Sequence, residues 1–407
     1  MKLLLTHPGT QYAPLLAAQL YKQGILHHFV TGIAYGEDQA LSSWVHKKIK
    51  ADRRKVWGVP KNKILSLKAH DLLSVVLKKR GWHNDDIFFH TNGWFEKKVP
   101  AHLIRSADIV IGFDTSSRFL IDRAHAYNKP YIMDVSIAHP VYKEKVFEMV
   151  RKRFPDWSTE LKPKKQRNIE AELSEIEKAD YFVVATAFTQ KTYLENGVNP
   201  NKIFVNPYGT NLQYFKNKWN TVDNSITEKK EITFLFFGSL TARKGFPWLC
   251  EIWQRITARY PHAKLIAAGH GVIPSAYKIP DGIKILGSIH PQERNALFAQ
   301  ADVFVFPSYF EGFAQVIIEA MACGLPVITT THTVGPEIIR PAENGFLAAP
   351  DDDDALYNSM RFFLENKEAI QPMGMAAYES VTPYTWDAYG ERWKSIAQEI
   401  LNRDAAL

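Results

Sequence analysis

Two glutamates that stand eight positions apart, Glu311 and Glu319, are the side chains of this chain whose type and spacing most directly suggest chemistry. Both lie in the segment VFVFPSYFEGFAQVIIEAMACGLPVITTT, residues 303–331. Carboxylates accept hydrogen bonds from hydroxyl groups, and the two glutamates flank a short stretch that begins with a glycine. This spacing favours a ligand that carries several hydroxyl groups.

The residues around the two glutamates predict the elements that position them. The apolar run 303–306 is typical of a buried strand, and apolar residues from Phe313 onward recur at helical spacing until Gly324 and Pro326. Glu311 should therefore lie in the loop after a strand, and Glu319 about two turns into the next helix. Because ligands of open α/β sheets bind at the carboxyl ends of strands and helix N-termini attract anions, we expect a phosphate group beside the hydroxyls.

Two further segments could contribute to such a site. The sequence GSLTARKG, residues 238–245, places Arg243 and Lys244 after the glycine Gly238, where two cations can neutralise a diphosphate. The sequence YIMDVSIAHP places Asp134 and His139 after another predicted strand. By spacing alone both signals are weak, since basic residues often occupy turns and a single histidine is more often structural.

Length and composition indicate a soluble protein of two domains. The chain has 407 residues, of which 46% are hydrophobic and 23% charged. No apolar run approaches the roughly 18 residues that span a bilayer, and the opening residues turn to His7, Pro8 and Gly9 too soon for a signal peptide. Only two cysteines occur, which favours the reducing cytoplasm, without disulfides or a cysteine metal site.

The charge is divided unevenly along the chain. Residues 1–220 hold 34 Lys and Arg against 21 Asp and Glu, a net charge of +13, while residues 221–407 hold 16 against 22, a net charge of −6. Residues 47–80 alone hold 12 basic and 2 acidic side chains, interspersed with Val56, Trp57 and Leu65. This composition predicts either contact with an anionic membrane or lipid-linked acceptor, or a solvated face. No nucleic-acid motif accompanies the charge, so no nucleic-acid partner is expected.

Buried strands alternate with amphipathic helices twice along the chain. This alternation predicts an α/β fold of two Rossmann-like, doubly wound parallel-sheet domains facing a central cleft. We place the domains at residues 1–210 and 211–385, with a polar linker within 206–230 and a terminal helix at 386–407. The predicted strands are 2–6, 29–33, 109–113, 131–135, 181–185, 203–205, 233–237, 264–268, 283–286, 303–306, 327–330 and 346–348.

Taken together, these motifs resemble the family 4 glycosyltransferases, enzymes of GT-B fold that use nucleotide sugars and retain the donor's anomeric configuration. The resemblance is most specific at EGFAQVIIEAMACGLPVI, which is similar to the Glu-x7-Glu signature of the family. It continues through FFGSLTARKG and GPEIIRPAENGFL, covers residues 180–350 well and extends to the first 180 residues only in outline. It also implies that the terminal helix crosses back onto the first domain.

The resemblance implies a role for each matching residue. Glu319 is expected to bind the ribose hydroxyls of the donor, and Glu311 to lie at the donor sugar. Arg243 and Lys244 are expected to hold the diphosphate. His139 would face the donor sugar from the first domain. Glycines and amides that allow close approach of the donor or acceptor complete the expected site: Gly9, Gly238, Gly312, Phe313, Ala314 and Gln315.

The implied activity is retaining transfer of a hexose-type sugar, in α linkage, from a nucleoside-diphosphate sugar to a glycan or lipid-linked acceptor, as in polysaccharide or glycolipid biosynthesis. No metal and no cofactor besides the donor is expected, because cations and a helix N-terminus can stabilise the departing diphosphate. The expected location is the cytoplasm or the inner face of the membrane. Two alternatives stay open: another GT-B activity, such as a sugar-nucleotide epimerase or a phosphorylase, and a catalytically silent nucleotide-sugar-binding subunit.

Three details test the resemblance. The family commonly has an arginine after the glycine at position 238, where this chain has Ser239, and an aspartate where it has Asn211. Both departures bear on the diphosphate contacts. The four aspartates 351–354 could suggest a metal site, but their place before a helical pattern predicts a helix N-cap.

Overall fold

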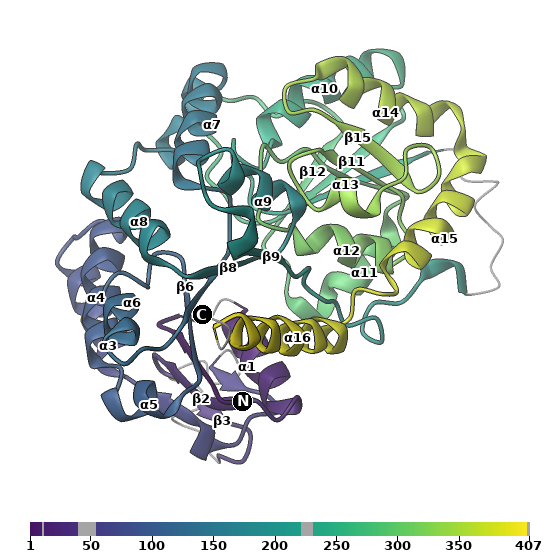
Figure 1. Ribbon diagram of the computed structural model, residues 1–407. Helices are drawn as coiled ribbons and strands as arrows, with labels where there is room; N and C mark the ends of the chain where they lie inside the picture. Colours follow the sequence, from purple (N-terminus) through teal and green to yellow (C-terminus); the bar gives the residue numbers. More distant parts are fainter. Residues whose placement is uncertain (10–11, 40–53, 221–230, 405–407) are drawn as a thin grey trace.

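The computed structural model describes residues 1–9, 12–39, 54–220 and 231–404 of the chain. Two parallel sheets occupy its two halves (Figure 1). Part of the basic stretch, residues 47–53, and part of the predicted linker, residues 221–230, lie outside the described residues.

Seven parallel strands form the first sheet, in the order β5-β2-β1-β6-β7-β8-β9. Strand β1 pairs with β2 on one side and β6 on the other, so the chain order reverses there. Leu3 and Leu5 of β1 point to one hydrophobic cluster, and Leu4 points to another on the opposite face, as expected for a sheet covered on both sides. The bounds are β1 Leu3–His7, β2 Leu26–Thr31, β5 Ile64–Ser66, β6 Ile109–Phe113, β7 Tyr131–Val135, β8 Tyr181–Val184 and β9 Ile203–Val205.

Helices cover both faces of this sheet. Helix α1 packs on the face that carries Leu3 and Leu5, and residues of α4 and α5 pack against Leu4. A pair of two-residue strands, β3 Tyr35–Gly36 and β4 Lys55–Val56, lies apart from the sheet. The helices of this half are α1 Ala13–Lys22, α3 Ala69–Lys79, α4 Asn84–Lys98, α5 Ala101–Ser106, α6 Leu120–His125, α7 Pro140–Arg153, α8 Gln166–Lys178 and α9 Ala187–Leu194.

Six parallel strands form the second sheet, in the order β12-β11-β10-β13-β14-β15. This is the strand order of a dinucleotide-binding fold, with its reversal between β10 and β13. The four residues of β13 are all buried. The strands are β10 Thr233–Phe237, β11 Lys264–Ala268, β12 Ile283–Gly287, β13 Val303–Phe306, β14 Val327–Thr330 and β15 Gly345–Ala348. The helices are α10 Phe246–Arg259, α11 Arg294–Gln300, α12 Gln315–Ala322, α13 Gly335–Ile338, α14 Asp353–Glu365, α15 Ile370–Val381 and α16 Trp386–Asp404.

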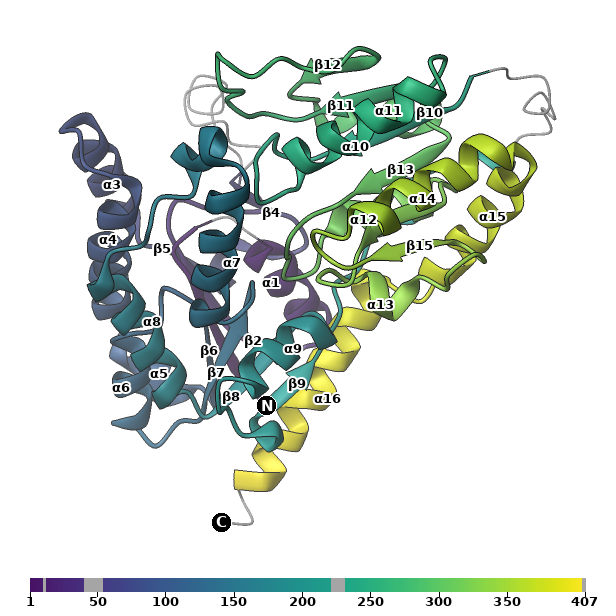
Figure 2. The same ribbon diagram turned by 90° about the horizontal axis from the view of Figure 1, so that it is seen from above.

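The last helix, α16, runs from the second half of the chain back to the first. It lies beside α1 in Figure 1, and Figure 2 shows it extending along the first sheet. Arg392 of α16 donates hydrogen bonds to Asn206 and to the carbonyl of Pro207, at 2.7 Å each. The predicted crossing helix is therefore present.

Most predicted strands occur where the sequence places them, because they are apolar runs bounded by turn residues. One prediction is displaced: the strand expected at 29–33 is β2, Leu26–Thr31, in which the half-buried pair His27 and His28 follows the first residue. Strand β5 was not predicted, since Ile64–Ser66 is short and lies within the lysine-rich stretch. The predicted cap at the aspartate run is confirmed, because Asp352 accepts a hydrogen bond of 2.9 Å from the amide of Ala355.

Candidate active site

A cavity of about 540 Å³ lies where the two sheets face each other. The second half lines it with residues that follow β10 and β13, the two strands at which the sheet order reverses. The first half contributes Tyr12, Ser136 and Ile137. Its position at a reversal of strand order is where nucleotide ligands bind open α/β sheets. Eight of its lining residues are predicted site residues: Gly238, Lys244, Glu311, Gly312, Phe313, Ala314, Gln315 and Glu319.

Glu311 is buried in this cavity and surrounded by donors. Its Oε1 atom accepts hydrogen bonds from Lys244 Nζ at 2.6 Å, Ser308 Oγ at 2.7 Å and an Nη of Arg243 at 3.0 Å. Burial alone would raise the pKa of Glu311, but the two cations hold that pKa below its usual value. Glu311 is therefore an ionised carboxylate fixed in one orientation.

The two predicted cations are not equivalent. Lys244 lines the cavity, whereas the Arg243 guanidinium lies behind Glu311 and donates to the carbonyl of Phe310 at 2.9 Å. Burial lowers the pKa of Lys244, an effect that the neighbouring Glu311 opposes. In this structure Lys244 is placed for direct contact with an anion, and Arg243 is placed to orient Glu311.

Glu319 lies in the same cavity on α12, paired with a cation that no sequence motif predicts. Arg294, the first residue of α11, approaches its two carboxylate oxygens at 3.2 and 3.3 Å. Burial raises the pKa of Glu319 to about 7, although Arg294 opposes the rise. The Nε atom of Arg294 has no hydrogen-bond partner among the described residues. The Glu319–Arg294 pair thus offers both an acceptor and donors to a polar ligand.

The N-terminus of α12 opens into the cavity between the two glutamates. No side chain caps this helix, and its N-cap residue Ala314 has φ = 69°, the left-handed region that costs a non-glycine residue about 1 kcal/mol. Ala314, Gln315 and Val316 all line the cavity. An uncapped helix N-terminus with positive partial charge favours an anion at this position.

Gly312 brings the two halves of the chain into contact at the base of the cavity. Its carbonyl accepts hydrogen bonds from the hydroxyls of Thr186 at 3.0 Å and Thr189 at 3.2 Å. A Cβ atom at position 312 would lie 1.9 Å from the carbonyl oxygen of Ser136. Only glycine allows this approach, which sets Glu311 opposite Ser136 and Ile137.

Besides Arg243, two predicted residues do not line this cavity. His139 is the N-cap of α7, where its Nδ1 atom accepts from the amide of Val141 at 3.3 Å, and its ring packs edge-on against Tyr193. Burial lowers its pKa to about 4, so the imidazole is neutral at pH 7. Gly9 donates its amide to His7 Nδ1 at 2.9 Å. The predicted roles of His139 and Gly9 in binding donor or acceptor stay predictions.

The two departures from the family pattern have different places in the structure. Ser239 lines the cavity, with its hydroxyl 3.5 Å from His270 Nε2. Asn211 caps a turn instead, because its side chain accepts from the amides of Gln213 and Tyr214, at 3.2 Å each. Arg294 also lines this cavity, where it forms an ion pair with Glu319.

Sequence reasoning missed Tyr12, Ser136, Tyr208 and Arg294 in the cavity. Tyr12 donates a hydrogen bond of 3.0 Å to Asp134, whose burial raises its pKa well above the usual value. Tyr208 packs against Phe313. Ser136 lies in the segment YIMDVSIAHP between Asp134 and His139, but no chemistry was assigned to it. For the other three, only their position after a strand or at the start of a helix could have drawn attention to them.

Comparison with known families identifies the second half of the chain. Residues 231–366 match the family described as glycosyl transferases group 1. The chain contains a glycosyltransferase group 1 domain. Among curated relatives, the gpi3 subunit of phosphatidylinositol N-acetylglucosaminyltransferase from Schizosaccharomyces pombe is 25% identical over 53% of this chain and 47% of its own length. O-antigen chain mannosyltransferase B from Escherichia coli is 35% identical over 38% of this chain and 45% of its own length. The chain spans about half the length of the curated relatives it matches.

Solved structures similar to this one extend beyond the group 1 domain to nearly the whole chain. Sucrose-phosphate synthase from Thermosynechococcus elongatus superimposes with a TM-score of 0.72 at 19% identity, covering 99% of this chain and all of its own. Anabaena HepE in complex with UDP and glucose gives a TM-score of 0.65 at 14% identity, covering 98% of this chain and all of its own. The predicted fold is confirmed: two parallel α/β sheets in the GT-B arrangement.

The described residues contain neither a metal-binding cluster nor a membrane-spanning helix. In that part of the chain, His, Cys, Asp and Glu side chains do not gather in groups of three or more able to hold a metal ion. No described helix is both long enough and apolar enough to cross a bilayer. Metal independence stays a prediction.

Proposed function

We propose that this protein is a retaining glycosyltransferase that moves a hexose-type sugar from a nucleoside-diphosphate sugar to a hydroxyl of a glycan or lipid-linked acceptor, forming an α linkage without a metal ion. One observation carries the proposal. A single cavity at the reversal of strand order holds an ionised glutamate, a lysine, an uncapped helix N-terminus and the Glu319–Arg294 pair. The group 1 domain and the GT-B fold support it.

We assign the three parts of the donor to three regions of the cavity by their charge. The ribose hydroxyls donate to Glu319, and Arg294 lies beside them. The diphosphate lies at Lys244 and the N-terminus of α12, where positive charge is concentrated. The sugar hydroxyls reach Glu311. This arrangement places the anomeric carbon between Glu311 and the residues Ser136 and Ile137 of the first half.

The reaction breaks the bond between the anomeric carbon and the diphosphate oxygen, and the electron pair leaves with the diphosphate. Lys244 and the α12 dipole stabilise the negative charge that develops on the leaving oxygen. The acceptor hydroxyl then bonds to the anomeric carbon from the face that the diphosphate leaves. Its proton passes to the departing diphosphate, so the α configuration of the donor is retained.

Glu311 is poorly suited to the alternative role of covalent nucleophile. Its Oε1 accepts from three donors, which lowers the basicity and the reactivity of that oxygen. Retaining glycosidases instead use a pair of carboxyl groups about 5–5.5 Å apart, one of them protonated. In this cavity the second glutamate, Glu319, lies on α12 and is paired with Arg294. We therefore assign Glu311 to binding and orienting the sugar.

The acceptor and the membrane are the second part of the proposal. Helix α3 presents the apolar side chains Leu72, Val75 and Val76 to solvent, with exposed fractions of 62%, 53% and 44%. The exposed basic residues Lys78, Lys79 and Arg80 follow them. Figure 2 shows α3 at the outer edge of the first half, far from the second sheet. An apolar stripe flanked by basic residues suits the cytoplasmic face of an anionic membrane, where a lipid-linked acceptor would lie.

The test of the activity is release of nucleoside diphosphate from a panel of nucleotide sugars, with and without acceptor glycans. Transfer predicts release that depends on the acceptor and a product with α configuration by NMR. Release at the same rate without acceptor, or conversion of the donor sugar to its epimer, would contradict the proposal. A chain that binds donor but never turns it over would be a silent subunit.

The test of the membrane face is sedimentation with vesicles that contain anionic lipid, at low and high salt. Wild-type protein should bind at low salt and be released by salt, because counterions screen the basic residues. Leu72→Asp and Val75→Asp together should weaken binding. The control exchanges two exposed apolar residues elsewhere, Val272→Asp and Met375→Asp. Equal binding of both double variants, or no binding at either salt, would refute the membrane contact.

A further inference from the structure

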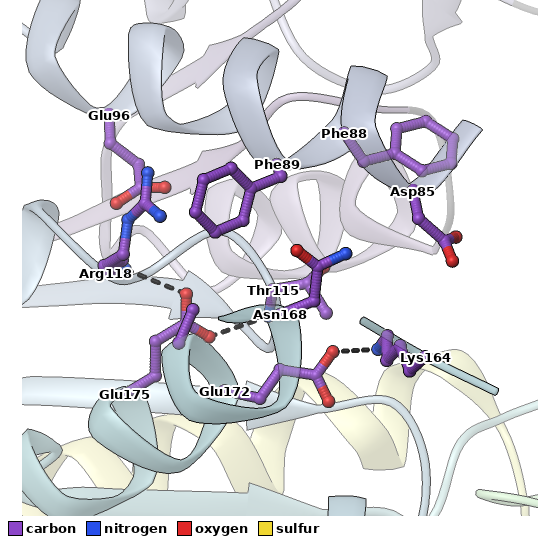
Figure 3. Close-up of a pocket in the computed structure, with 11 residues that line it drawn as sticks. Asp85, Phe88, Phe89, Glu96, Thr115, Arg118, Lys164, Asn168, Glu172 and Glu175 are labelled. Atoms are coloured by element: carbon purple, nitrogen blue, oxygen red, sulfur yellow. Dashed lines mark hydrogen bonds and ion pairs between the residues drawn. The ribbon is translucent and has the colours of Figure 1, made fainter. Parts of the chain in front are cut away.

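A second pocket, of about 100 Å³, lies within the first half of the chain between α4 and α8 (Figure 3). Its lining includes Phe88 and Phe89 of α4, Arg118 from the loop after β6, and Asn168 and Glu172 of α8. It shares no lining residue with the donor cavity. Since about 10–15 Å³ of such space holds one water, the pocket has room for roughly seven to ten atoms of that size.

Helix α8 points a row of polar side chains inward. Asn168, Glu172 and Glu175 follow one another at four- and three-residue spacing, so they share one face, and they are only 6%, 6% and 3% exposed. Buried polar side chains in a helix normally need partners. Two of the three have them, and the third does not.

Glu175 and Glu172 have structural roles. Glu175 accepts hydrogen bonds from the amides of Thr115, Ser117 and Arg118 at 2.8 to 3.0 Å, and thereby shapes the loop after β6. Glu172 pairs with Lys143 at 3.3 Å and with Lys164. These contacts account for both carboxylates and leave them poorly available to a ligand.

Asn168 is the exception. Its Oδ1 atom is buried and accepts no hydrogen bond from any described residue. Figure 3 shows the amide lying between α8 and the Phe89 ring of α4. A buried acceptor without a partner costs about 1–3 kcal/mol, so a leucine of similar size would make the folded protein more stable. Keeping an asparagine here is favourable only if something else donates to it.

Arg118 stands in the same pocket with its donors unused. Its guanidinium lies against the rings of Phe89 and Phe119, at 4.1 and 4.3 Å from their centres. None of the guanidinium N–H groups donates a hydrogen bond to a described residue, and the nearby Glu96 interacts with this side chain through its charge. Helix α4 has a glycine beside it, and a Cβ atom at position 93 would lie 2.7 Å from Arg118 Nη2. Gly93 therefore makes room for the guanidinium, although glycine within a helix costs about 0.5–1 kcal/mol.

The chemistry of these groups specifies the ligand. Asn168 Oδ1 needs a donor and Arg118 needs an acceptor, and a hydroxyl group serves as both. The phenyl rings of Phe88 and Phe89 offer apolar faces. Four carboxyl groups line the pocket against the two cations Arg118 and Lys164: Asp85, Glu96, Glu172 and Glu175. Burial raises the pKa of Glu96 to about 7 and that of Glu175 to about 8, so Asp85 and Glu172 carry most of the negative charge. They balance the two cations, which leaves no excess of positive charge to attract an anion. We propose that this pocket binds one neutral sugar unit of the acceptor glycan.

The pocket is adjacent to the donor cavity but separate from it. Thr115, which lines the pocket, follows Asp114, and Asp114 accepts from the amide and hydroxyl of Ser136 at 3.0 and 2.9 Å. Ser136 lines the donor cavity. The two cavities are linked through Asp114 but share no lining residue, so the proposal assigns the bound unit to another part of the acceptor glycan than the sugar that receives the transfer. That the bound sugar belongs to an acceptor rests on the proposed function. The binding of a neutral sugar in this pocket does not.

Ligand-observed saturation-transfer NMR with the full-length protein tests the binding directly. The probes are methyl α-mannopyranoside, methyl α-glucopyranoside and N-acetylglucosamine, with glucuronate as an anionic comparison. At least one neutral probe should show transfer at millimolar concentration, and glucuronate should show less. Asn168→Leu and Arg118→Met should each weaken binding about tenfold, the effect of one lost hydrogen bond of about 1.4 kcal/mol. The matched control is Gln166→Leu, an exposed amide on the same helix.

Melting temperature separates a ligand site from a structural role. Asn168→Leu should melt at or above the wild-type temperature while losing the sugar signal, whereas a structural asparagine would lower it. Glu319→Ala should keep the sugar signal and lose nucleotide binding, so failure of the sugar site and failure of the proposed function are distinguishable. An unchanged signal in Asn168→Leu, preferential binding of glucuronate, or no transfer with any neutral probe would overturn the proposal. A last comparison uses the same sugar linked to a lipid in neutral vesicles. Tighter binding of the lipid-linked form indicates a glycolipid acceptor, and tighter binding of the free form indicates a free glycan.

Discussion

Replacing Glu319 by glutamine should make the protein more stable and bind nucleotide less tightly. Glu319 is 8% exposed, and its burial raises its pKa from 4.5 to about 7. A folded-state pKa above the unfolded value means that folding favours the protonated form. Below about pH 4.5 Glu319 is protonated in both states and its burial carries no ionisation cost. The free energy of unfolding then falls as the pH rises through about 7.

The size of the effect follows from the same two values. At 1.36 kcal/mol for each pH unit, the ionised side chain costs the folded state about 3 kcal/mol at pH 8. At pH 5 the cost is below about 1 kcal/mol. Glutamine has no charge to bury, so Glu319→Gln should gain about 3 kcal/mol at pH 8. For a domain of this size, that corresponds to a rise of about 6–12 °C in melting temperature.

The assay is thermal unfolding of wild type and Glu319→Gln at pH 5 and pH 8, with Glu379→Gln as an exposed control on α15. The variant's advantage should be large at pH 8 and small at pH 5. Nucleoside diphosphate should raise the melting temperature of wild type more than that of the variant, since ribose hydroxyls lose a charged acceptor. A variant less stable than wild type at pH 8, or an advantage that does not change with pH, would refute the reasoning.

Three further predictions concern the rest of the site. Lys244→Met should weaken nucleoside diphosphate binding roughly tenfold to a hundredfold in calorimetry, while binding of the nucleoside alone stays the same, because the lysine contacts only phosphate. An equal loss for both ligands would contradict that assignment. Gly312→Ala should lower turnover and increase the radius measured by small-angle scattering, since a Cβ 1.9 Å from Ser136 O pushes the halves apart; an unchanged radius with full activity would contradict it. His139→Asn keeps an N-cap for α7 but removes the imidazole, so turnover should fall at an unchanged melting temperature, whereas His139→Ala should also lose about 1 kcal/mol of stability. Wild-type turnover in His139→Asn would show that capping is the residue's whole role.

Short-range features of the site could be predicted from the sequence. The order strand, loop, helix places Glu311 and Glu319 on the two sides of a helix N-terminus, since β13 and α12 fix the geometry of residues this close in the chain. The same holds for Lys244, which follows β10, and for the cap at Asp352. Local periodicity and turn chemistry determine such positions without knowledge of distant contacts.

Partners far apart in the sequence were decided by the tertiary structure. From the sequence, Arg243 and Lys244 were expected to have the same role. In the structure Arg243 donates to the carbonyl of Phe310 and lies behind Glu311, whereas Lys244 lines the cavity. Arg294 reaches Glu319 across 25 positions without any motif. His139 follows a strand, as predicted, but its imidazole accepts a hydrogen bond from the amide of Val141 and caps α7.

The inward face of α8 is a further feature that only the tertiary structure decided. Asn168, Glu172 and Glu175 are polar, and nothing local in the sequence indicates that the face they share is buried. The sequence by itself determines how Glu311 and Glu319 lie relative to each other, since one strand, one loop and one helix set their positions. Which cation each glutamate meets, and which asparagine is left without a donor, depends on contacts across more than 20 residues that only the folded chain brings together.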